Sequence, residues 1–191
     1  MVSMVCMIPV TTRSAHDHAV RYPREIAAAV TLRAACAALV EPGPGHGPRA
    51  ASAAVVTACS ALATRLAVVR FLADPGSPSP RSVRPLDPFT EPTPAGLLGT
   101  GPRPVAARVR TAGDRCTDAW RTWRADGAAG DAVRGAAGAL SVAAWAAWAL
   151  GSVARAETRA RYALDLRSDD PLAGLVLRSV LAGARPAWER R

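Results

Sequence analysis

Apolar residues recur at helical spacing along most of the chain, most clearly between residues 105 and 124. The apolar positions there follow one another at intervals of four, three, four, four and three: Val105, Val109, Ala112, Cys116, Trp120 and Trp123. Residues three or four apart share one face of a helix. The spacing therefore predicts an amphipathic helix with both tryptophans on its apolar face.

Two alanine-rich stretches nearer the N-terminus also predict helices. The first runs from Arg24 to Gly43 and ends at Pro42 and Gly43. The second runs from about residue 50 to 73. Its apolar positions follow spacings of three and four: Val55, Cys59, Leu62, Leu66 and Val69. We expect an Ala-rich helical region over residues 24–73, preceded by a disordered N-terminus over residues 1–23.

Residues 74–104 differ in composition, because they hold nine of the sixteen prolines. Neither a helix interior nor a central strand tolerates proline at that density. This predicts an irregular linker, of polyproline type or disordered, that acts as an inert spacer; a Pro-rich ligand for another domain is the alternative.

Three further helices are expected after the break "ADGAAGD". The first follows Asp131 as a candidate N-cap and ends near Gly151. The second is "VARAETRARYALDLRS", with small residues inward and opposite charges at i, i+4 outward. The third takes Asp170 as N-cap and Pro171 as its first residue. We therefore predict an all-α fold of short antiparallel helices, arranged as hairpins or a bundle, with a C-terminal helical domain at 105–188.

The run from residue 135 to 154 contains no charged residue, so it is long enough to span a bilayer. Most of it is Ala, Gly and Ser, and Trp145 and Trp148 lie in its middle, whereas interfacial tryptophans favour the ends of a span. A packed helix explains more, because small residues allow helices to approach closely and indoles fill the remaining volume. We expect burial within the protein, with membrane association as the alternative.

All 24 basic residues are arginine, and the formal net charge is +9. The absence of Lys, Asn and Gln suggests a high-GC bacterial genome. The charge is spread evenly, with 10 Arg against 6 acidic residues up to residue 104 and 14 against 9 after it. A nucleic-acid surface usually forms a clustered stripe, so nucleic-acid binding is kept as an alternative.

The order "AAWAAWALGSVARAETRARYALDLRSDDPLAGLVLRSVLAGARP" resembles the C-terminal segment of the actinobacterial domain-of-unknown-function family numbered 4192, over about residues 131–188. That family ends in a tryptophan-rich alanine helix, a glycine, a helix ending in Ala-Leu, and then Asp-Pro with a leucine-rich helix. It has no established activity, so the resemblance implies lineage alone. The part "YALDLRSDDPLA" also resembles a junction between tetratricopeptide repeats, although no second copy occurs at that period.

Residues that could carry chemistry are few. The four cysteines form no C-x-x-C pair, which favours small buried thiols in a reducing cytoplasm. His16 and His18 flank Asp17 near the N-terminus, and His46 lies in a glycine-proline turn, so we expect no metal site. No nucleophile elbow, P-loop or zinc-protease motif occurs. We therefore expect no catalytic residues and no cofactor.

The tryptophans are the one unusual concentration of side chains. We expect core packing for four of them, and partial exposure for the fifth, near the C-terminus. The alternative is an anchor for a partner, since Trp and Arg are enriched in interface hot spots. The candidate partner-binding residues are Trp120, Trp123, Trp145, Trp148 and Trp188. These observations favour a non-enzymatic, cytoplasmic protein-interaction module whose protein partner the sequence does not identify.

Overall fold

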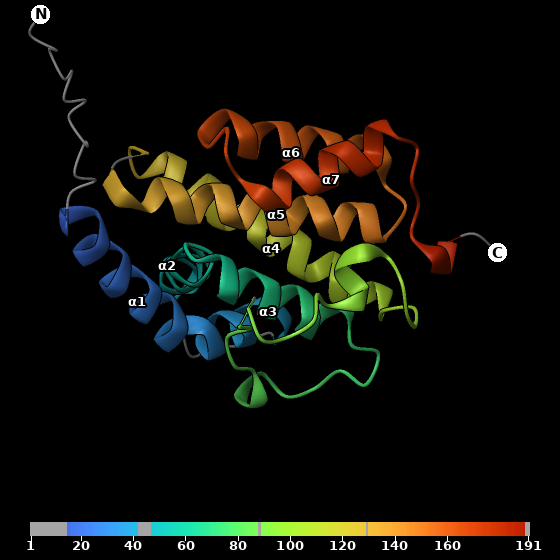
Figure 1. Ribbon diagram of the computed structural model, residues 1–191, viewed down its shortest axis with the longest axis horizontal. Coiled ribbons are helices and arrows are strands. Elements are labelled where there is room, and N and C mark those ends of the chain that lie inside the picture. The colour runs from blue at the N-terminus through green and yellow to red at the C-terminus, as the bar shows by residue number, and fades with distance from the viewer. Residues whose placement is uncertain (1–14, 42–46, 88, 129, 190–191) are drawn as a thin grey trace, which may run out of the picture.

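Seven α-helices and several short 3₁₀ turns make up the part of the chain that the structure describes, and no strand occurs there. This computed structural model describes residues 15–41, 47–87, 89–128 and 130–189, with the backbone alone at 15–22 and 131. The predicted all-α class is confirmed. The helices, shown in Figure 1, are α1 (Ala15–Val40), α2 (Pro48–Ala58), α3 (Leu62–Ala73), α4 (Ala106–Ala125), α5 (Val133–Ala149), α6 (Val153–Leu166) and α7 (Pro171–Leu181).

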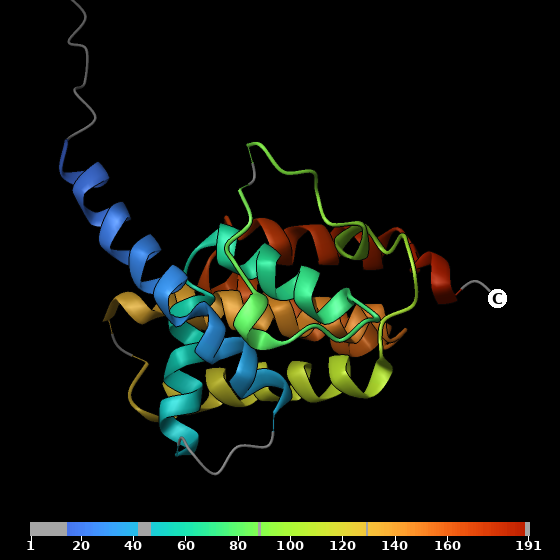
Figure 2. The same cartoon turned by 90° about the horizontal axis from the view of Figure 1, so that it is seen from below.

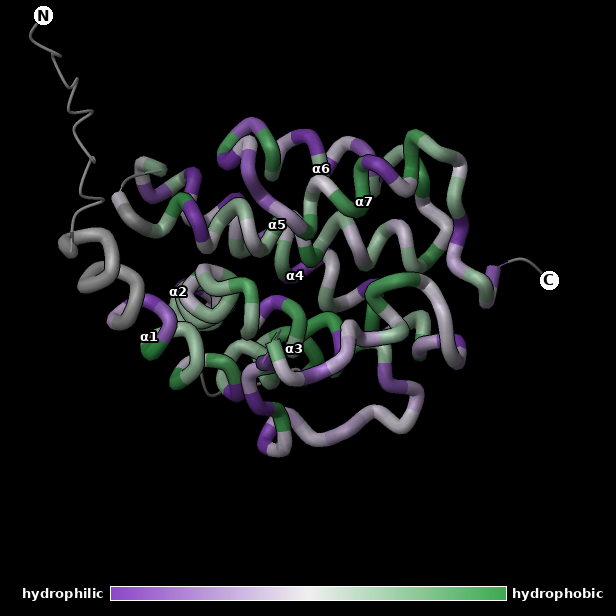
Figure 3. The backbone as a smooth tube through the Cα atoms, in the orientation of Figure 1, coloured by the Kyte–Doolittle hydropathy of each residue, from purple (hydrophilic) through white to green (hydrophobic). Residues whose placement is uncertain are grey.

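Helix α5 lies at the centre of the fold. It packs against α4 and α6 most extensively, and α2, α3 and α7 also contact it (Figure 1). Every residue from Gly135 to Ala149 is buried. In Figure 3, α5 runs through the middle of the molecule as a pale and green tube, whereas purple, hydrophilic segments lie further out along α6. Burial on all sides accounts for the uncharged run in the sequence.

No single helix of the described residues is both long and apolar enough to cross a bilayer. Helices α2 and α3 reach that length and composition only as a pair, with a bend of 114° between them.

Two glycines allow the end of α2 to approach α5 closely. A Cβ atom at Gly135 would lie 2.0 Å from the carbonyl oxygen of Val56, and one at Gly138 would lie 2.0 Å from that of Cys59. No Cβ fits at such distances, so the contact between the two helices requires glycine at both positions.

The predicted single helix over residues 50–73 is wrong, because the chain breaks between α2 and α3. Hydroxyl groups satisfy the backbone at the break. Thr64 Oγ1 donates to the carbonyls of Ala58 and Ala61, and Ser60 Oγ donates to Thr57 O at 2.7 Å. Such side chains offer the backbone an alternative to helical hydrogen bonds. The break turns α3 across the molecule.

Two predicted helix starts also need correction. Helix α1 begins at Ala15 and contains Pro23, so the backbone of the last part of the expected disordered N-terminus is helical. Asp131 lies in a 3₁₀ turn (η3, Gly130–Ala132), and the N-cap of α5 is Ala132. The prediction for α7 is confirmed, since Asp170 caps its N-terminus and Pro171 is its first residue.

Residues 74–104, named the strap here, are irregular as predicted but do not form an inert spacer. The strap contains two 3₁₀ turns, η1 (Pro80–Ser82) and η2 (Ala95–Leu98); in Figure 2 part of it runs beside the helices and part loops out beyond them. Its backbone donates from Leu86 N to Ala63 O at 3.1 Å. Buried strap residues include Pro80, Val83, Leu86, Pro94, Leu97 and Gly99. Proline prevents regular structure, yet these apolar side chains still gain by burial against the helices.

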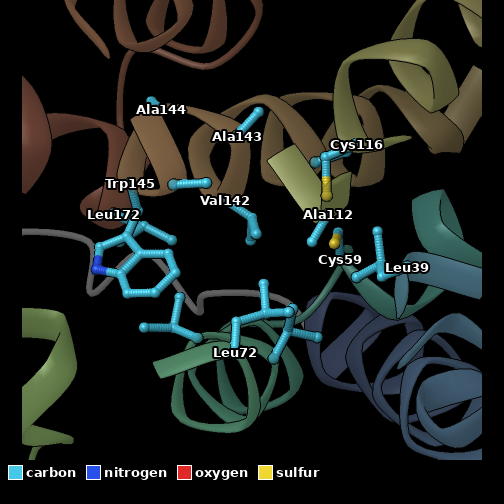
Figure 4. Packing of buried hydrophobic residues seen from close by; sticks show 14 of the residues in the cluster. Leu39, Cys59, Leu72, Ala112, Cys116, Val142, Ala143, Ala144, Trp145 and Leu172 are labelled. Carbon is cyan, nitrogen blue, oxygen red and sulfur yellow. The ribbon is translucent and has the colours of Figure 1, made fainter. Parts of the chain in front are cut away.

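One hydrophobic core extends across the regions that the sequence separated. Figure 4 shows Leu39 and Cys59 from the N-terminal helices near Cys116 of α4, with Leu72 of α3 beside Trp145 of α5. The helical region 24–73 and the expected C-terminal domain 105–188 therefore share their core.

Candidate functional site

A groove of about 630 Å³ runs between α4 and α6, over α5. It is called the α4–α6 groove below. Its position follows from the packing, because α4 and α6 both contact α5 extensively but make few or no close contacts with each other. Its lining residues are Asp114, Thr117, Asp118, Trp120, Arg121, Leu140, Ala154, Arg155, Thr158, Arg159 and Tyr162.

One end of the groove is aromatic. The ring centroids of Trp120 and Tyr162 lie 5.7 Å apart at an interplanar angle of 33°. The guanidinium carbon of Arg124 lies 5.6 Å from the centroid of Trp120, which is cation–π range. Tyr162 is 48% exposed. A flat, partly exposed aromatic surface is therefore available next to a positive charge.

The other end carries arginines from α6. Arg159 donates to Ala143 O at 3.2 Å and to Asp114 Oδ1 at 3.2 Å, so two contacts hold its guanidinium in place. Arg155 is exposed, and its side chain forms no hydrogen bond or ion pair within the described ranges. A pre-positioned guanidinium beside an unengaged one is suited to an acceptor such as a carboxylate.

Trp120, which lines this groove, was predicted as a candidate partner-binding residue, whereas the residues that α6 contributes were not predicted. Arg155, Arg159 and Tyr162 recur at intervals of four and three, on a flank of the helix beside the predicted inward alanines. That spacing already placed them on one face. Nothing in the sequence showed that this face borders α4.

Three of the five tryptophans are core residues. Trp145, Trp148 and Trp188 are 0%, 5% and 8% exposed. Their indole nitrogens donate to backbone carbonyls of Gly96, Ala184 and Ala149 respectively. The predicted partial exposure of Trp188 is therefore wrong, and in this fold all three side chains are enclosed rather than presented to a partner.

Trp120 lines the α4–α6 groove, but Trp123 does not. It is half-buried and lines a smaller hollow of about 260 Å³ between α2 and α4. Its indole nitrogen is buried without a hydrogen-bond partner. The predicted shared face of the α4 tryptophans thus divides between two sides of the helix bundle.

The most deeply buried charges belong to one ion pair. Arg65 of α3 donates to Asp170 at the start of α7, and the two side chains are 3% and 0% exposed. Arg65 also lies 3.4 Å from the hydroxyl of Ser141, while Asp170 accepts from Ala173 N at 3.0 Å as the α7 cap. The pair links α3 to α7 and is closed to ligands, so its role is structural.

The three described cysteines are free and buried, as predicted. Burial raises the pKa of Cys36 and of Cys59 to about 12, and it raises the pKa of Cys116 well above its usual value. Thiols with such pKa values are poor nucleophiles at neutral pH.

No group of three His, Cys, Asp or Glu side chains suited to a metal occurs among the described residues. His46 and the side chains of His16 and His18 lie outside the described residues. Hydrogen bonds from Arg167 are the main cause of the lowered pKa of Asp169. The Asp169 carboxylate is exposed and forms an ion pair with Arg167.

Comparison with known proteins gives no further guide to the groove. No family model matches the chain, no curated protein does, and no solved structure does. The resemblance to the family numbered 4192 therefore stays a prediction from the sequence.

Proposed function

We propose that this protein is an interaction module that binds a short polypeptide segment in the α4–α6 groove. The observation that carries the proposal is the joint presence of an aromatic pair and two arginines of α6 in one open groove. Aromatic and arginine side chains supply most of the binding energy at protein interfaces.

The spacing of the two ends defines the segment that fits. Arg155 and Tyr162 are seven residues apart on α6, which corresponds to about 10 Å along a helix. An extended chain covers that distance in about three residues. The segment should therefore carry an acidic side chain and an aromatic or large apolar side chain three residues apart.

The charges of the groove favour an acidic segment only moderately. Asp114 already pairs with Arg159, and Asp118 pairs with Arg121 at 2.9 Å. Arg155 remains for an incoming carboxylate, so the apolar contact supplies much of the affinity. Such binding should persist at about 0.5 M salt, where exposed charges are largely screened.

The nucleic-acid alternative has less support. Within the described ranges at least nine arginines already form ion pairs with acidic side chains, among them Arg70 and Arg84 with the same Glu91. Phosphate binding requires a cluster of available cations and falls steeply with salt.

The test is selection from a random-peptide phage library against the full chain. Selected peptides are then measured by fluorescence polarisation. We expect enrichment of the acidic-x-x-aromatic pattern in one or both chain directions. Trp120→Ala and Arg155→Glu should each weaken binding by about tenfold or more. The control Arg81→Glu makes the same charge change on the exposed strap and should leave binding unchanged.

Two results would overturn the proposal. One is a library without enrichment. The other is binding that is equally strong in the Trp120→Ala and Arg155→Glu variants, provided that circular dichroism shows both to be folded. Binding of single-stranded DNA or RNA that disappears at about 0.5 M salt, without peptide binding, would favour the nucleic-acid alternative instead.

A further inference from the structure

A hollow of about 600 Å³ lies where α1, the end of α2 and the start of α5 meet. It is called the α1–α5 hollow below, and the three elements meet on one side of the molecule (Figure 1). Small-molecule sites in proteins usually have volumes of roughly 300–1,000 Å³. The hollow is therefore large enough for a small ligand, and it shares no lining residue with the α4–α6 groove.

Arginine side chains give the α1–α5 hollow its charge. Arg24 comes from α1 and Arg134 from the first turn of α5, and no carboxylate occurs among the described residues that line the hollow. The α4–α6 groove differs, because Asp114 and Asp118 line it together with its arginines. A hollow lined by charges of one sign concentrates ions of the opposite sign. The α1–α5 hollow is therefore suited to an anion.

The guanidinium of Arg24 has no hydrogen-bond acceptor in the described part of the protein. Its Nε is buried without a partner, and its other nitrogens donate no hydrogen bond there either. The buried Nε atoms of Arg65 and Arg108 also lack partners, but the terminal nitrogens of both side chains donate hydrogen bonds elsewhere. A buried donor without an acceptor costs free energy. An oxyanion bound in the hollow would supply that acceptor.

Two hydroxyl groups and an apolar wall complete the lining. Ser60 Oγ donates to Thr57 O at 2.7 Å, so the Ser60 oxygen can still accept a hydrogen bond. Thr57 Oγ1 forms no hydrogen bond within the described ranges, so its hydroxyl can donate to a ligand. The other side chains of the lining are apolar: Pro23, Ala27, Val56, Ala132 and Val133.

We infer that the α1–α5 hollow binds a small amphipathic anion, with an oxyanion head at the two arginines and an apolar body against the apolar wall. Guanidinium groups match the oxygens of carboxylate and phosphate through paired hydrogen bonds. A hollow of about 600 Å³ accommodates at most about twenty non-hydrogen atoms, because a water molecule occupies about 30 Å³ in the liquid. The ligand is therefore a small molecule.

Isothermal titration calorimetry of the full chain with four eight-carbon compounds tests the head group. Octanoate and octyl phosphate carry an oxyanion, octan-1-ol has the same body without charge, and octylammonium has the opposite charge. We expect the tighter of the two anions to bind with a dissociation constant on the order of 0.1–1 mM. Octan-1-ol and octylammonium should bind at least about tenfold more weakly. The tighter anion identifies the head group as carboxylate or phosphate, and equal affinities show that the hollow recognises the charge that both carry.

Charge removal locates the bound anion. Arg24→Gln and Arg134→Gln should each weaken binding of the tighter anion by about tenfold or more, because each removes a charged donor from the hollow. The matched control is Arg110→Gln, which removes the same charge from an exposed arginine of α4 outside the hollow. It should bind the anion as the wild type does.

Filling the hollow tests the site without changing its charge. Ala27 lines the hollow from an exposed position on α1, so a large side chain there would occupy part of its volume. Ala27→Trp should abolish binding of both anions. The control Ala34→Trp adds the same side chain at an exposed position of α1 outside the hollow and should not affect binding.

Absence of binding of both anions at about 5 mM overturns the inference. Octan-1-ol that binds as tightly as the anions also overturns it, because the hollow would then select apolar surface alone. A third contrary result is binding that neither Arg24→Gln nor Ala27→Trp changes, with circular dichroism showing both variants to be folded. Because the α1–α5 hollow and the α4–α6 groove share no lining residue, these outcomes are independent of peptide binding.

Discussion

Removing one partner of the buried Arg65–Asp170 pair should destabilise the protein far more than removing both. A single truncation leaves an uncompensated charge in a site where the side chains are 3% and 0% exposed. The expected cost is about 3–5 kcal/mol for either single variant. That is a large share of the roughly 5–15 kcal/mol by which a domain of this size is stable.

The variants Arg65→Met and Asp170→Ser separate the charge from the other roles of these residues. Methionine keeps the apolar stem of Arg65, whose buried Nε has no hydrogen-bond partner. Serine keeps an oxygen that can accept from Ala173 N and cap α7. The double variant should therefore lie within about 1–2 kcal/mol of the wild type, with a coupling energy of at least about 3 kcal/mol.

Urea unfolding followed by far-UV circular dichroism measures these free energies, provided that the slope of the transition is unchanged between variants. The control pair is Arg121→Met with Asp118→Ser, an ion pair that is exposed on both sides. Its coupling should stay below about 1 kcal/mol. Additive effects of the Arg65 and Asp170 substitutions would refute the reasoning, since they would show that neither charge depends on the other.

Three further predictions follow from glycine, cysteine and glutamate positions. Gly138→Ala should lower the free energy of unfolding by about 1–3 kcal/mol, because its Cβ would lie 2.0 Å from the Cys59 carbonyl oxygen. Gly174→Ala, whose Cβ meets only the end of a flexible arginine, should raise it by about 0.5–1 kcal/mol; urea unfolding compares the two, and the opposite order would contradict the helix contact. In a Cys6→Ser variant, the three buried thiols should react with Ellman's reagent at about pH 8 only after denaturant is added, because burial raises their pKa values. Hydrogen bonds from Arg84, from the Asp87 amide and from Arg70 lower the pKa of Glu91 to about 2, so its contribution to stability is present above about pH 4.5 and is lost toward pH 2. The melting temperature of Glu91→Gln should accordingly vary less with pH over that interval, and an unchanged pH profile would contradict the role of this carboxylate.

The features that were predicted correctly depend on residues close together in the sequence. The Asp170 cap and Pro171 start of α7 are recognisable because capping involves only neighbouring residues. The buried face of α4 was likewise predicted from spacing, since Val109, Ala112 and Cys116 are all fully buried.

Long-range contacts explain what the sequence did not reveal. Asp170 was predicted as a cap, yet its second partner, Arg65, is 105 residues away in the chain. The strap illustrates the same limit. Its prolines excluded helix and strand. The sequence did not show that the strap packs against α5, where the Trp145 indole nitrogen donates a hydrogen bond to Gly96 O. The groove combines both cases, because periodicity placed Arg155 and Tyr162 on one face of α6, and packing placed that face beside Trp120.

Helices α5 and α1 differ in how completely the fold covers their apolar side chains. Helix α5 is apolar all round, and five other helices account for every side of it. Helix α1 is apolar on two faces, and the fold covers one of them. The Ile26 and Val30 side chains therefore keep apolar surface in contact with water, whereas every residue of α5 from Gly135 to Ala149 is buried.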